Sequence, residues 1–380
     1  MLETRAPIAA RRDLLGLAAA VRVRHPVRAR RDFRFGGLSI LVESNSPALI
    51  DTLQQYFHCF ERDWKPADGG ERNGIVVTAL ESEPAWFPLA YRDWPRDPGK
   101  LHLKERVADL AGGRVVHKVR TGMQFLVGGS MRLAIGPCLA NANQIINFIV
   151  TQYIEHHLHR GWQLCHAASV NAGGRGLILA GFAGAGKSTL ALHLVGRGLD
   201  FVSNDRVLVQ AHSSGATAVG VPKLPRINPG TAMNQSQLHG ILPAARRLEL
   251  AGLAADALWR LEEKYDVDVD AAFGPGFLAQ WTRAAAFVVL AWRREDSSPP
   301  RLREASLADR PDLLAAIAKS PGPFHVGRGG NLQAPVRPDS EGYLRHLARV
   351  PLFEITGGVD FARASDLCME LLPQRGASVA

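Results

Sequence analysis

The sequence predicts a protein of the α/β class, with a smaller N-terminal domain and a larger C-terminal domain. Its 380 residues exceed the size of one small domain, and 46% hydrophobic residues are enough to form two cores. Segments of alternating hydrophobicity occur together with amphipathic helical segments along the chain. No segment approaches the run of about 20 apolar residues that a membrane helix requires. We therefore expect no membrane span.

The distribution of the cysteines predicts reduced thiols. Cys59, Cys138, Cys165 and Cys368 are scattered, with no C-x-x-C pair and no Cys/His cluster at zinc spacing. This pattern favours free thiols over a disulfide framework or a structural metal. The chain also does not open on a charged, apolar and then small-residue leader. We expect a cytoplasmic location.

The net charge of +9 is concentrated at the N-terminus. Residues 1–34 hold nine arginines against three acidic residues, so this segment contributes +6 of the total. Such a start is typical of transit segments and nucleic-acid-binding arms, but no aromatic residue is interleaved before Phe33. We interpret the run as a solvated face around Leu14, Leu15 and Leu17, and nucleic acid is not an expected partner.

The N-terminal domain is predicted to begin with two short strands and a helix. Residues 33–43 alternate in hydrophobicity around Gly36 and Gly37. Ser46 and Pro47 then occupy the N-cap and the first position of an amphipathic helix. The other predicted elements of this domain are a strand over 74–79, two or three strands over 114–135 and a helix over 141–158.

The domain boundary is predicted near the end of that helix, which gives domains over residues 1–155 and 156–380. Predicted strands over 163–170 and 176–180 lead into a glycine-rich segment, and a helix over 187–197 follows it. The remaining predicted elements are strands over 199–202, 206–210, 284–292 and 352–355, and a closing helix over 361–372.

The glycine-rich segment is a phosphate-binding loop. Residues 181–189 read Gly-Phe-Ala-Gly-Ala-Gly-Lys-Ser-Thr, which matches the Walker A pattern G-x4-G-K-[ST] between a predicted strand and a predicted helix. The glycines let backbone N–H groups approach phosphate oxygens, and the helix N-terminus adds a favourable dipole. The predicted nucleotide-binding residues are Gly181, Gly184, Ala185, Gly186, Lys187, Ser188 and Thr189.

The polar side chains of this loop have separate predicted roles. Lys187 brings a positive charge to the β- and γ-phosphates, Ser188 offers a hydroxyl to Mg²⁺, and Thr189 can reach the α-phosphate. ATP and Mg²⁺ are the predicted ligands. The loop alone does not determine the reaction, because motors, GTPases, transporters and kinases share it.

Two residues outside the loop are candidates for the chemistry. Asp205 follows Lys187 by 18 residues, at the end of the next predicted strand, on the sheet edge where α/β proteins bind ligands. Its carboxylate could hold Mg²⁺ or accept a proton from a hydroxyl, or it could be an aspartate that only closes a turn. His166 lies on the strand before the loop, where a lone histidine is more often structural.

Three consecutive segments resemble a known enzyme family. Residues 165–170, 176–189 and 190–207, which lie in one stretch of about 45 residues, are similar to the catalytic domain of bacterial HPr kinase/phosphorylase. Within that superfamily they look closest to the divergent HPr-kinase-related kinases, of the related kinase B type. The resemblance implies a P-loop kinase domain with a mixed sheet and flanking helices. It also implies that His166 and Asp205 line the reacting phosphate, with Asp205 as the general base. Together with Lys187 of the loop, they are the predicted catalytic residues.

The sequence departs from the family in two places. The family's acidic pair is Asn204-Asp205 in this chain, so a role that requires two carboxylates is not implied. The family's downstream signature is replaced by residues 222–231 and 261–268. We therefore predict neither HPr as the acceptor nor the phosphorolysis that accompanies the kinase reaction in the parent family.

Three further charged residues are candidates at the same site. Arg226 and Lys264 could contact the phosphate or the acceptor, because a transferring phosphoryl group needs charge stabilisation beyond Mg²⁺ and one lysine. Glu262, on a predicted helix, could bind Mg²⁺ together with Ser188 and Asp205. The alternative for all three is a solvated surface charge.

The predicted activity is transfer of the γ-phosphoryl group of ATP to a hydroxyl of an unidentified acceptor, either a protein serine or threonine or a small metabolite. The alternative is a nucleotide-binding regulatory or scaffold ATPase without phosphotransfer. A nucleic-acid ATPase is disfavoured, because the predicted strand over 284–292 ends in Arg293 and Arg294 and offers no aspartate. The parent family forms closed oligomers, which leaves a homo-oligomer open.

Overall fold

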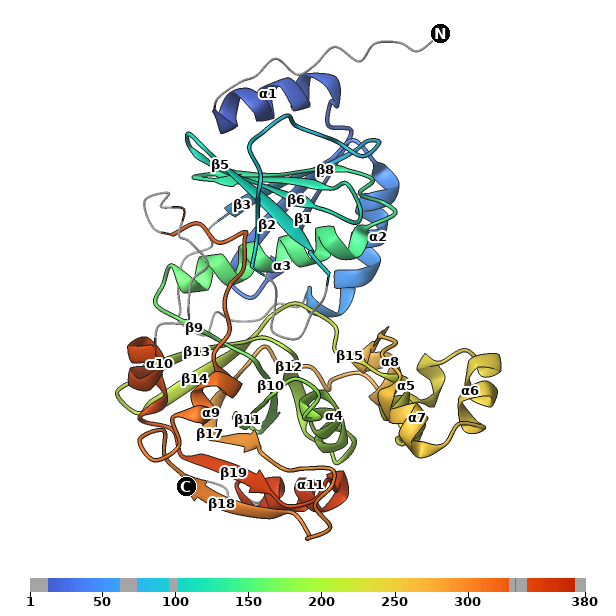
Figure 1. Ribbon diagram of the computed structural model, residues 1–380, viewed down its shortest axis with the longest axis vertical. Helices are drawn as coiled ribbons and strands as arrows, with labels where there is room; N and C mark the ends of the chain where they lie inside the picture. Colours follow the sequence, from blue (N-terminus) through green and yellow to red (C-terminus); the bar gives the residue numbers. More distant parts are fainter. Residues whose placement is uncertain (1–12, 62–73, 96–101, 328–331, 333–339, 373–380) are drawn as a thin grey trace. The chain divides into compact units, whose positions relative to one another are not determined.

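The computed structural model (Figure 1) describes residues 13–61, 74–95, 102–327, 332 and 340–372. The chain forms two compact units. The first comprises Met1–Arg160 and Ser320–Arg337, and the second comprises Gly161–Lys319 and Pro338–Ala380. The expected boundary was residue 155, and the return of residues 320–337 to the first unit was not foreseen. Each unit contains a mixed sheet with flanking helices, which confirms the predicted α/β class.

The first unit is built on a sheet that has eight strands in the described residues, in the order β1-β2-β3-β8-β7-β6-β5-β4. The strands β2, β3 and β8 are parallel, and the other neighbours are antiparallel. The bounds are β1 Ala29–Phe35, β2 Leu38–Ser44, β3 Gly74–Glu81, β4 Arg92–Asp93, β5 Glu105–Leu110, β6 Gly113–Lys118, β7 Gln124–Gly128 and β8 Met131–Gly136. The helices are α1 Leu14–Arg24, α2 Pro47–Phe57 and α3 Ala142–Leu158, with the 3-10 turn η1 His58–Phe60.

Helix α2 begins as its capping residues predict. The Oγ of Ser46 accepts a hydrogen bond from the backbone N–H of Leu49 at 3.3 Å, and Pro47 occupies the first turn. The helix buries Leu49 and Leu53 completely. The N-terminal capping signal is therefore sufficient to place this element.

Helix α1 has the solvated face that was interpreted from the basic run, with Arg22 and Arg24 exposed, and an apolar face on its other side. Leu14 and Leu17 are buried against the sheet, together with Val21, whereas Leu15 is 67% exposed. The apolar positions recur at helical spacing, so one side of α1 contributes to the core. Several arginines of the basic start are ion-paired, among them Arg30 with Glu43, Arg31 with Glu61 and Arg34 with Asp32.

The second unit is built on a sheet that has nine strands in the described residues. The strands run in the order β12-β10-β11-β17-β14-β13-β9, with β19 beside β17 and β18 beside β19. The strand bounds are β9 Gln163–Cys165, β10 Ala167–Ala172, β11 Arg175–Gly181, β12 Asp200–Ser203, β13 Val207–His212, β14 Gly215–Gly220, β17 Trp281–Leu290, β18 Arg301–Ala305 and β19 Leu352–Thr356. The helices around this sheet are α4 Lys187–Gly196, α9 Asp312–Ile317, α10 Ser340–Leu347 and α11 Phe361–Glu370.

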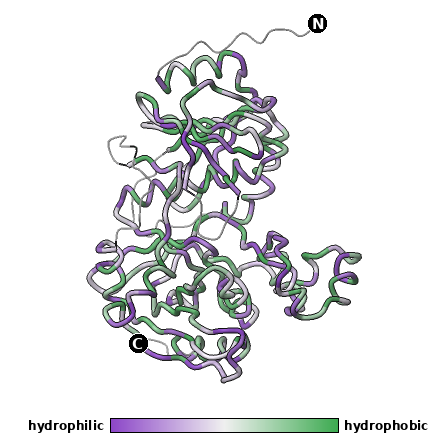
Figure 2. Tube along the Cα trace, in the orientation of Figure 1, coloured by the Kyte–Doolittle hydropathy of each residue, from purple (hydrophilic) through white to green (hydrophobic). Residues whose placement is uncertain are grey.

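Strand β17 is the centre of this sheet. It pairs in parallel with β11 and β19 and antiparallel with β14. Residues 285–290 are all hydrophobic and buried. A strand covered on both faces has this composition, as the sequence predicted. Hydrophobic segments, drawn in green, recur through the second unit in Figure 2. The parallel pairing of β11 with β17 fixes the strand from which the glycine-rich loop leaves the sheet.

The predicted strand over residues 163–170 is interrupted at His166. The segment before it, β9, pairs with β13, whereas the segment after it, β10, pairs with β11 and β12. Between the two, the backbone N–H of His166 donates to the carbonyl of Ile317 at 2.6 Å. His166 therefore lies at a bend where the chain changes strand partners, not inside a continuous strand.

Residues 226–273 form a helical arm that projects beside α4 (Figure 1). The arm contains β15 Arg226–Ile227, α5 Pro229–Met233, η2 Ser236–Ile241, α6 Ala244–Ala251, α7 Ala255–Arg260, β16 Tyr265–Asp266 and α8 Val269–Phe273. Its small core includes Leu192 of α4, which packs with Ile227 and Leu238. The arm is thus anchored on the helix that follows the glycine-rich loop.

In the described residues, no helix is both long enough and apolar enough to cross a membrane. The four cysteines are free and buried.

Candidate functional site

The glycine-rich loop connects the end of β11 to the start of α4. Gly184 and Gly186 have φ angles of 80° and 90°, in the left-handed region that favours glycine. A Cβ atom on Gly186 would also lie 2.7 Å from the ring of Phe361 in α11. Gly186 is therefore required both by its backbone conformation and by the close approach of α11.

Lys187 is held inside the loop. Its side chain is 8% exposed, and its Nζ donates to the carbonyl oxygens of Gly181 at 2.8 Å and Phe182 at 3.2 Å. Burial lowers the pKa of Lys187 to about 8; the charge of Asp205 raises this pKa and that of Lys319 lowers it. The ammonium group is partly desolvated and lies within electrostatic range of both side chains.

The two hydroxyl residues after Lys187 have different partners. The Oγ of Ser188 donates to Oδ1 of Asn204 at 2.8 Å, and Asn204 is 6% exposed. The Oγ1 of Thr189 instead forms a hydrogen bond with Oγ1 of Thr231 in the helical arm, at 2.8 Å. Ser188 thus links the loop to the segment that carries the candidate carboxylate, whereas Thr189 links it to the arm.

Ala185 in the loop is held by a hydrogen bond from a side chain outside the loop. Its carbonyl oxygen accepts a hydrogen bond from Nε1 of Trp292 at 2.8 Å, and the Trp292 ring contacts Phe361 edge to face, with ring centroids 5.1 Å apart. Gly181, Gly184, Ala185 and Gly186 therefore lie in one loop whose backbone is set by tertiary contacts.

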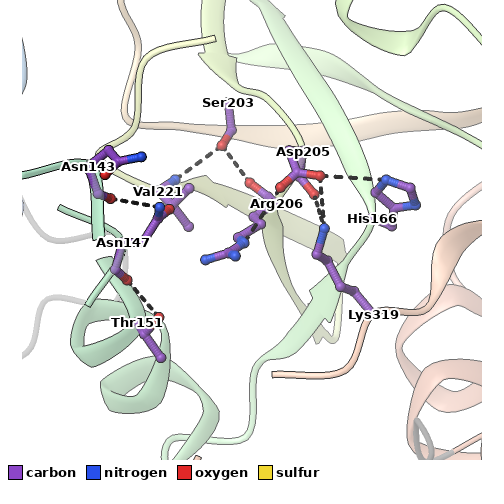
Figure 3. A network of polar contacts seen from close by, with 9 residues as sticks. All are labelled: Asn143, Asn147, Thr151, His166, Ser203, Asp205, Arg206, Val221 and Lys319. Atoms are coloured by element: carbon purple, nitrogen blue, oxygen red, sulfur yellow. Dashed lines mark hydrogen bonds and ion pairs between the residues drawn. The ribbon is translucent and has the colours of Figure 1, made fainter. Parts of the chain in front are cut away.

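Asp205 lies in a tight turn between β12 and β13. Its φ angle is 64°, and no other non-glycine residue in the described part of the chain has a positive φ. The turn is closed by the hydroxyl of Ser203, which donates to the carbonyl of Arg206 at 2.5 Å and accepts from the N–H of Val221 at 3.2 Å (Figure 3). A strained backbone held by the surrounding structure is frequent at functional sites.

The carboxylate of Asp205 lies between cations (Figure 3). The Nζ of Lys319 lies 2.8 Å from Oδ1, and it also donates to the Asp205 carbonyl at 3.3 Å. On the other side, the Nε of Arg206 is 3.6 Å from Oδ2. Burial alone would raise the pKa of Asp205, but the charges of Lys319 and Arg206 hold it well below its ordinary value. Asp205 is therefore ionised at neutral pH.

His166 is brought next to this carboxylate. Its Nε2 lies 3.6 Å from Oδ1 of Asp205. Burial and the nearby charges of Lys319 and Lys187 lower the pKa of His166 to about 4, although Asp205 acts in the opposite direction. The imidazole is neutral at pH 7, so it can offer a hydrogen bond to a phosphoryl group but not a positive charge.

The other predicted residues lie in the helical arm. Arg226 forms an ion pair with Asp266 at 2.9 Å, across the β15–β16 pair, and its Nη2 is 3.4 Å from the carbonyl oxygen of Lys264. Glu262 is exposed and follows the end of α7 at Arg260, so the prediction that it lies on a helix is wrong. The residue after α7, Leu261, has an extended backbone with ψ of 111°, which ends the helix before Glu262.

The expected magnesium ligands are divided between two parts of the second unit. Ser188 and Asp205 belong to the loop and the adjacent turn, whereas Glu262 belongs to the arm. Within the described residues, no group of three or more His, Cys, Asp or Glu side chains is arranged to hold a metal ion by itself. The side-chain oxygens that gather near the loop are those of Ser188 and Asn204, with Asp205 next in sequence.

Sequence reasoning missed Asn204, Lys223 and Lys319 as candidate site residues. The charges of Lys319 and Lys223 both lower the pKa of Asp205. The chain contains only eight lysines, and three of them, from separate segments, gather around this carboxylate. The scarcity of lysine is the signal in the sequence that could have pointed to Lys223 and Lys319, because each occurrence of a rare residue type is more informative.

Comparisons with known proteins find likeness among solved structures only. No protein-family model matches this sequence, and no curated protein matches it. Among solved structures, the HPr(Ser) kinase/phosphatase from Coxiella burnetii is similar, with 13% sequence identity and a TM-score of 0.28. The similarity covers 55% of this chain and 93% of that chain. A likeness at this TM-score assigns neither a family nor an activity to the chain.

Proposed function

We propose that this protein is an ATP-dependent phosphotransferase, with the nucleotide bound on residues 181–189 and Asp205 facing the acceptor. The observation that carries this proposal is the hydrogen bond from Ser188 to Asn204, at 2.8 Å. It joins the start of α4 to the residue before Asp205, so the phosphate-binding loop and the candidate base belong to one site. A kinase needs this combination, because both reactants must be held together.

The loop fits a triphosphate. The left-handed conformations of Gly184 and Gly186 and the N-terminus of α4 favour an anion at this position. The ammonium of Lys187 contacts two loop carbonyls, and a phosphate oxygen is a stronger acceptor for it than a carbonyl. Nucleotide binding would thus stabilise the charged form of Lys187, which burial disfavours.

The oxygen ligands near the loop fit Mg²⁺. Ser188, Asn204 and Asp205 provide a hydroxyl, an amide and a carboxylate oxygen, and Mg²⁺ in such enzymes needs few protein ligands because phosphate oxygens and water complete its shell. When bound, the ion would neutralise charge on the β- and γ-phosphates. These three residues would hold it.

Asp205 would serve as the base. The acceptor hydroxyl oxygen forms a bond to the γ-phosphorus, the bond from that phosphorus to the β,γ-bridging oxygen breaks, and ADP leaves. The hydroxyl proton passes to the Asp205 carboxylate and then to solvent. The acceptor is a serine or threonine of a protein, or a hydroxyl of a small metabolite.

Incubation with γ-labelled ATP and a cell lysate tests this proposal. After the reaction, the lysate is separated into protein, small-molecule and free-phosphate fractions. Label in a protein band or a discrete metabolite supports the kinase, provided that Lys187→Ala slows its appearance by about 100-fold or more. Label found only as free phosphate would instead favour the nucleotide-hydrolysing regulatory module.

A further inference from the structure

Lys319 extends its side chain to the site from a backbone that hydrogen bonds hold in place. Its N–H lies 3.2 Å from the carbonyl oxygen of Leu164 and 3.1 Å from the hydroxyl of Tyr343, and the preceding residue, Ala318, bridges to Cys165. The backbone is thus fixed beside β9, while the ammonium group extends on a four-carbon stem to Asp205. Such a stem lets the charge move by several ångströms without a change in the backbone.

The ammonium groups of Lys319 and Lys187 both lie within electrostatic range of the Asp205 carboxylate. That of Lys319 contacts Oδ1 of Asp205 at 2.8 Å, and it is close enough to Lys187 for its charge to lower the pKa of that residue. Two ammonium groups repel each other, and an anion between them offsets this repulsion. The tail of a triphosphate on the loop is an anion in that place, and it carries more charge than one carboxylate.

We propose that Lys319 is a catalytic residue, whose ammonium group moves from Asp205 to the γ-phosphoryl oxygens when ATP binds. This inference rests on the proposed phosphotransfer. The movement has two consequences. The γ-phosphoryl group gains a second lysine where charge develops during transfer, and Oδ1 of Asp205 becomes available to the acceptor hydroxyl.

Arg206 explains why Asp205 remains ionised after this movement. The Nε of Arg206 lies 3.6 Å from Oδ2 of Asp205, and in the described residues this nitrogen has no hydrogen-bond partner. Arg206 follows Asp205 directly in the chain, and the hydroxyl of Ser203 holds its backbone carbonyl, so under this proposal its guanidinium keeps its place beside the carboxylate. One cation therefore stays beside the carboxylate while the other is transferred to the phosphate.

Calorimetry with two nucleotides tests the proposal on the full chain. Lys319→Gln is titrated with the non-hydrolysable β,γ-imido analogue of ATP and with ADP, each with Mg²⁺. We expect the analogue to bind about 10- to 100-fold more weakly than to the wild type, the size of a lost charged hydrogen bond, and ADP to bind with unchanged affinity. Lys319→Arg should recover most of the lost affinity.

Lys118→Gln is the matched control. Lys118 also forms an ion pair with a carboxylate, Glu105, at 2.6 Å, and its side chain has a similar exposure, 19% against 23% for Lys319. It belongs to the first unit, so neither nucleotide should lose affinity in this variant. A general loss of binding in both lysine variants would contradict a specific role for Lys319.

A double variant separates direct contact from an effect through Asp205. If Lys319 binds the phosphate directly, Lys319→Gln weakens binding of the analogue at least as much in an Asp205→Asn background. If Lys319 only neutralises Asp205, the loss disappears in that background, and the proposal is overturned. It is also overturned if Lys319→Gln weakens the analogue and ADP equally. A wild type that binds neither nucleotide would instead refute the proposed function itself.

Discussion

The hydroxyl of Ser188 donates a hydrogen bond to the side-chain oxygen of Asn204 at 2.8 Å, and this contact joins the glycine-rich loop to the turn after β12. Asn204 directly precedes Asp205 in this turn. The amide of Asn204 accepts the hydrogen bond from the serine hydroxyl but adds no charge, so Asp205 alone supplies the negative charge of the turn. Asp205 is in turn surrounded by Lys319 and Arg206, which keep it ionised.

The loop lysine should be essential for turnover. Lys187→Ala removes the buried ammonium that lies 2.8 Å from the carbonyl oxygen of Gly181. We expect kcat/KM for phosphotransfer to fall by about 10²–10³-fold, the usual effect of losing one stabilising group at a developing charge. Circular dichroism should show an unchanged fold. Wild-type activity in this variant would mean that the working site is elsewhere.

Gly186 should be intolerant of a side chain for two separable reasons. Gly186→Ala places a methyl group in a left-handed backbone and 2.7 Å from the Phe361 ring. We expect the free energy of unfolding to fall by about 2–5 kcal/mol, from the strain and the clash together. The measurement is denaturant unfolding.

Gly173→Ala is the matched control for that experiment. Gly173 has a φ angle of 58°, but a Cβ atom there would meet no other atom within 4 Å. This variant should therefore show only the backbone strain, about 1–2 kcal/mol. In a Gly186→Ala background, Phe361→Leu should recover part of the stability. Equal losses in the two glycine variants would show that the contact with α11 has no cost.

The cysteines should be unreactive in the native protein. Burial raises the pKa of Cys138 and Cys165 above the ordinary range, and it raises the pKa of Cys368 to about 12 despite the opposing charge of Arg197. Since the thiolate is the reacting species, Cys368 should have a thiolate fraction lower by about 10³-fold than an ordinary thiol. Reaction with a thiol reagent at pH 8 should therefore be slow until denaturant is added. Rapid labelling without unfolding would contradict the burial of these side chains.

The elements that were predicted well are those with signals in consecutive residues. The loop over 181–189 follows a contiguous pattern, and Ser46 with Pro47 marks the start of α2. The end of the strand before Asp205 also follows from local hydrophobicity. In these segments the local preference and the tertiary structure agree, which is why a single sequence is sufficient.

The predictions that failed depend on contacts between distant residues. Residues 163–170 read as one strand in the sequence, but at His166, whose N–H donates to the carbonyl of Ile317, the chain changes strand partners. The contact of Lys319 with Asp205 spans 114 positions, so no local pattern contains it. Glu262 was assigned to a helix from nearby leucines, although α7 ends at Arg260.

The most direct test of the central claim compares phosphotransfer by Asp205→Asn with that by the wild type. The measurement is a single-turnover experiment with γ-labelled ATP and the lysate fraction that the wild type labels. Asparagine tolerates the left-handed backbone at this position and keeps the side-chain size, so the site should remain folded. We predict that the variant still binds ATP but transfers the γ-phosphoryl group about 10²–10⁴-fold more slowly. Transfer at the wild-type rate by a variant that binds ATP would contradict the assignment of Asp205 as the base.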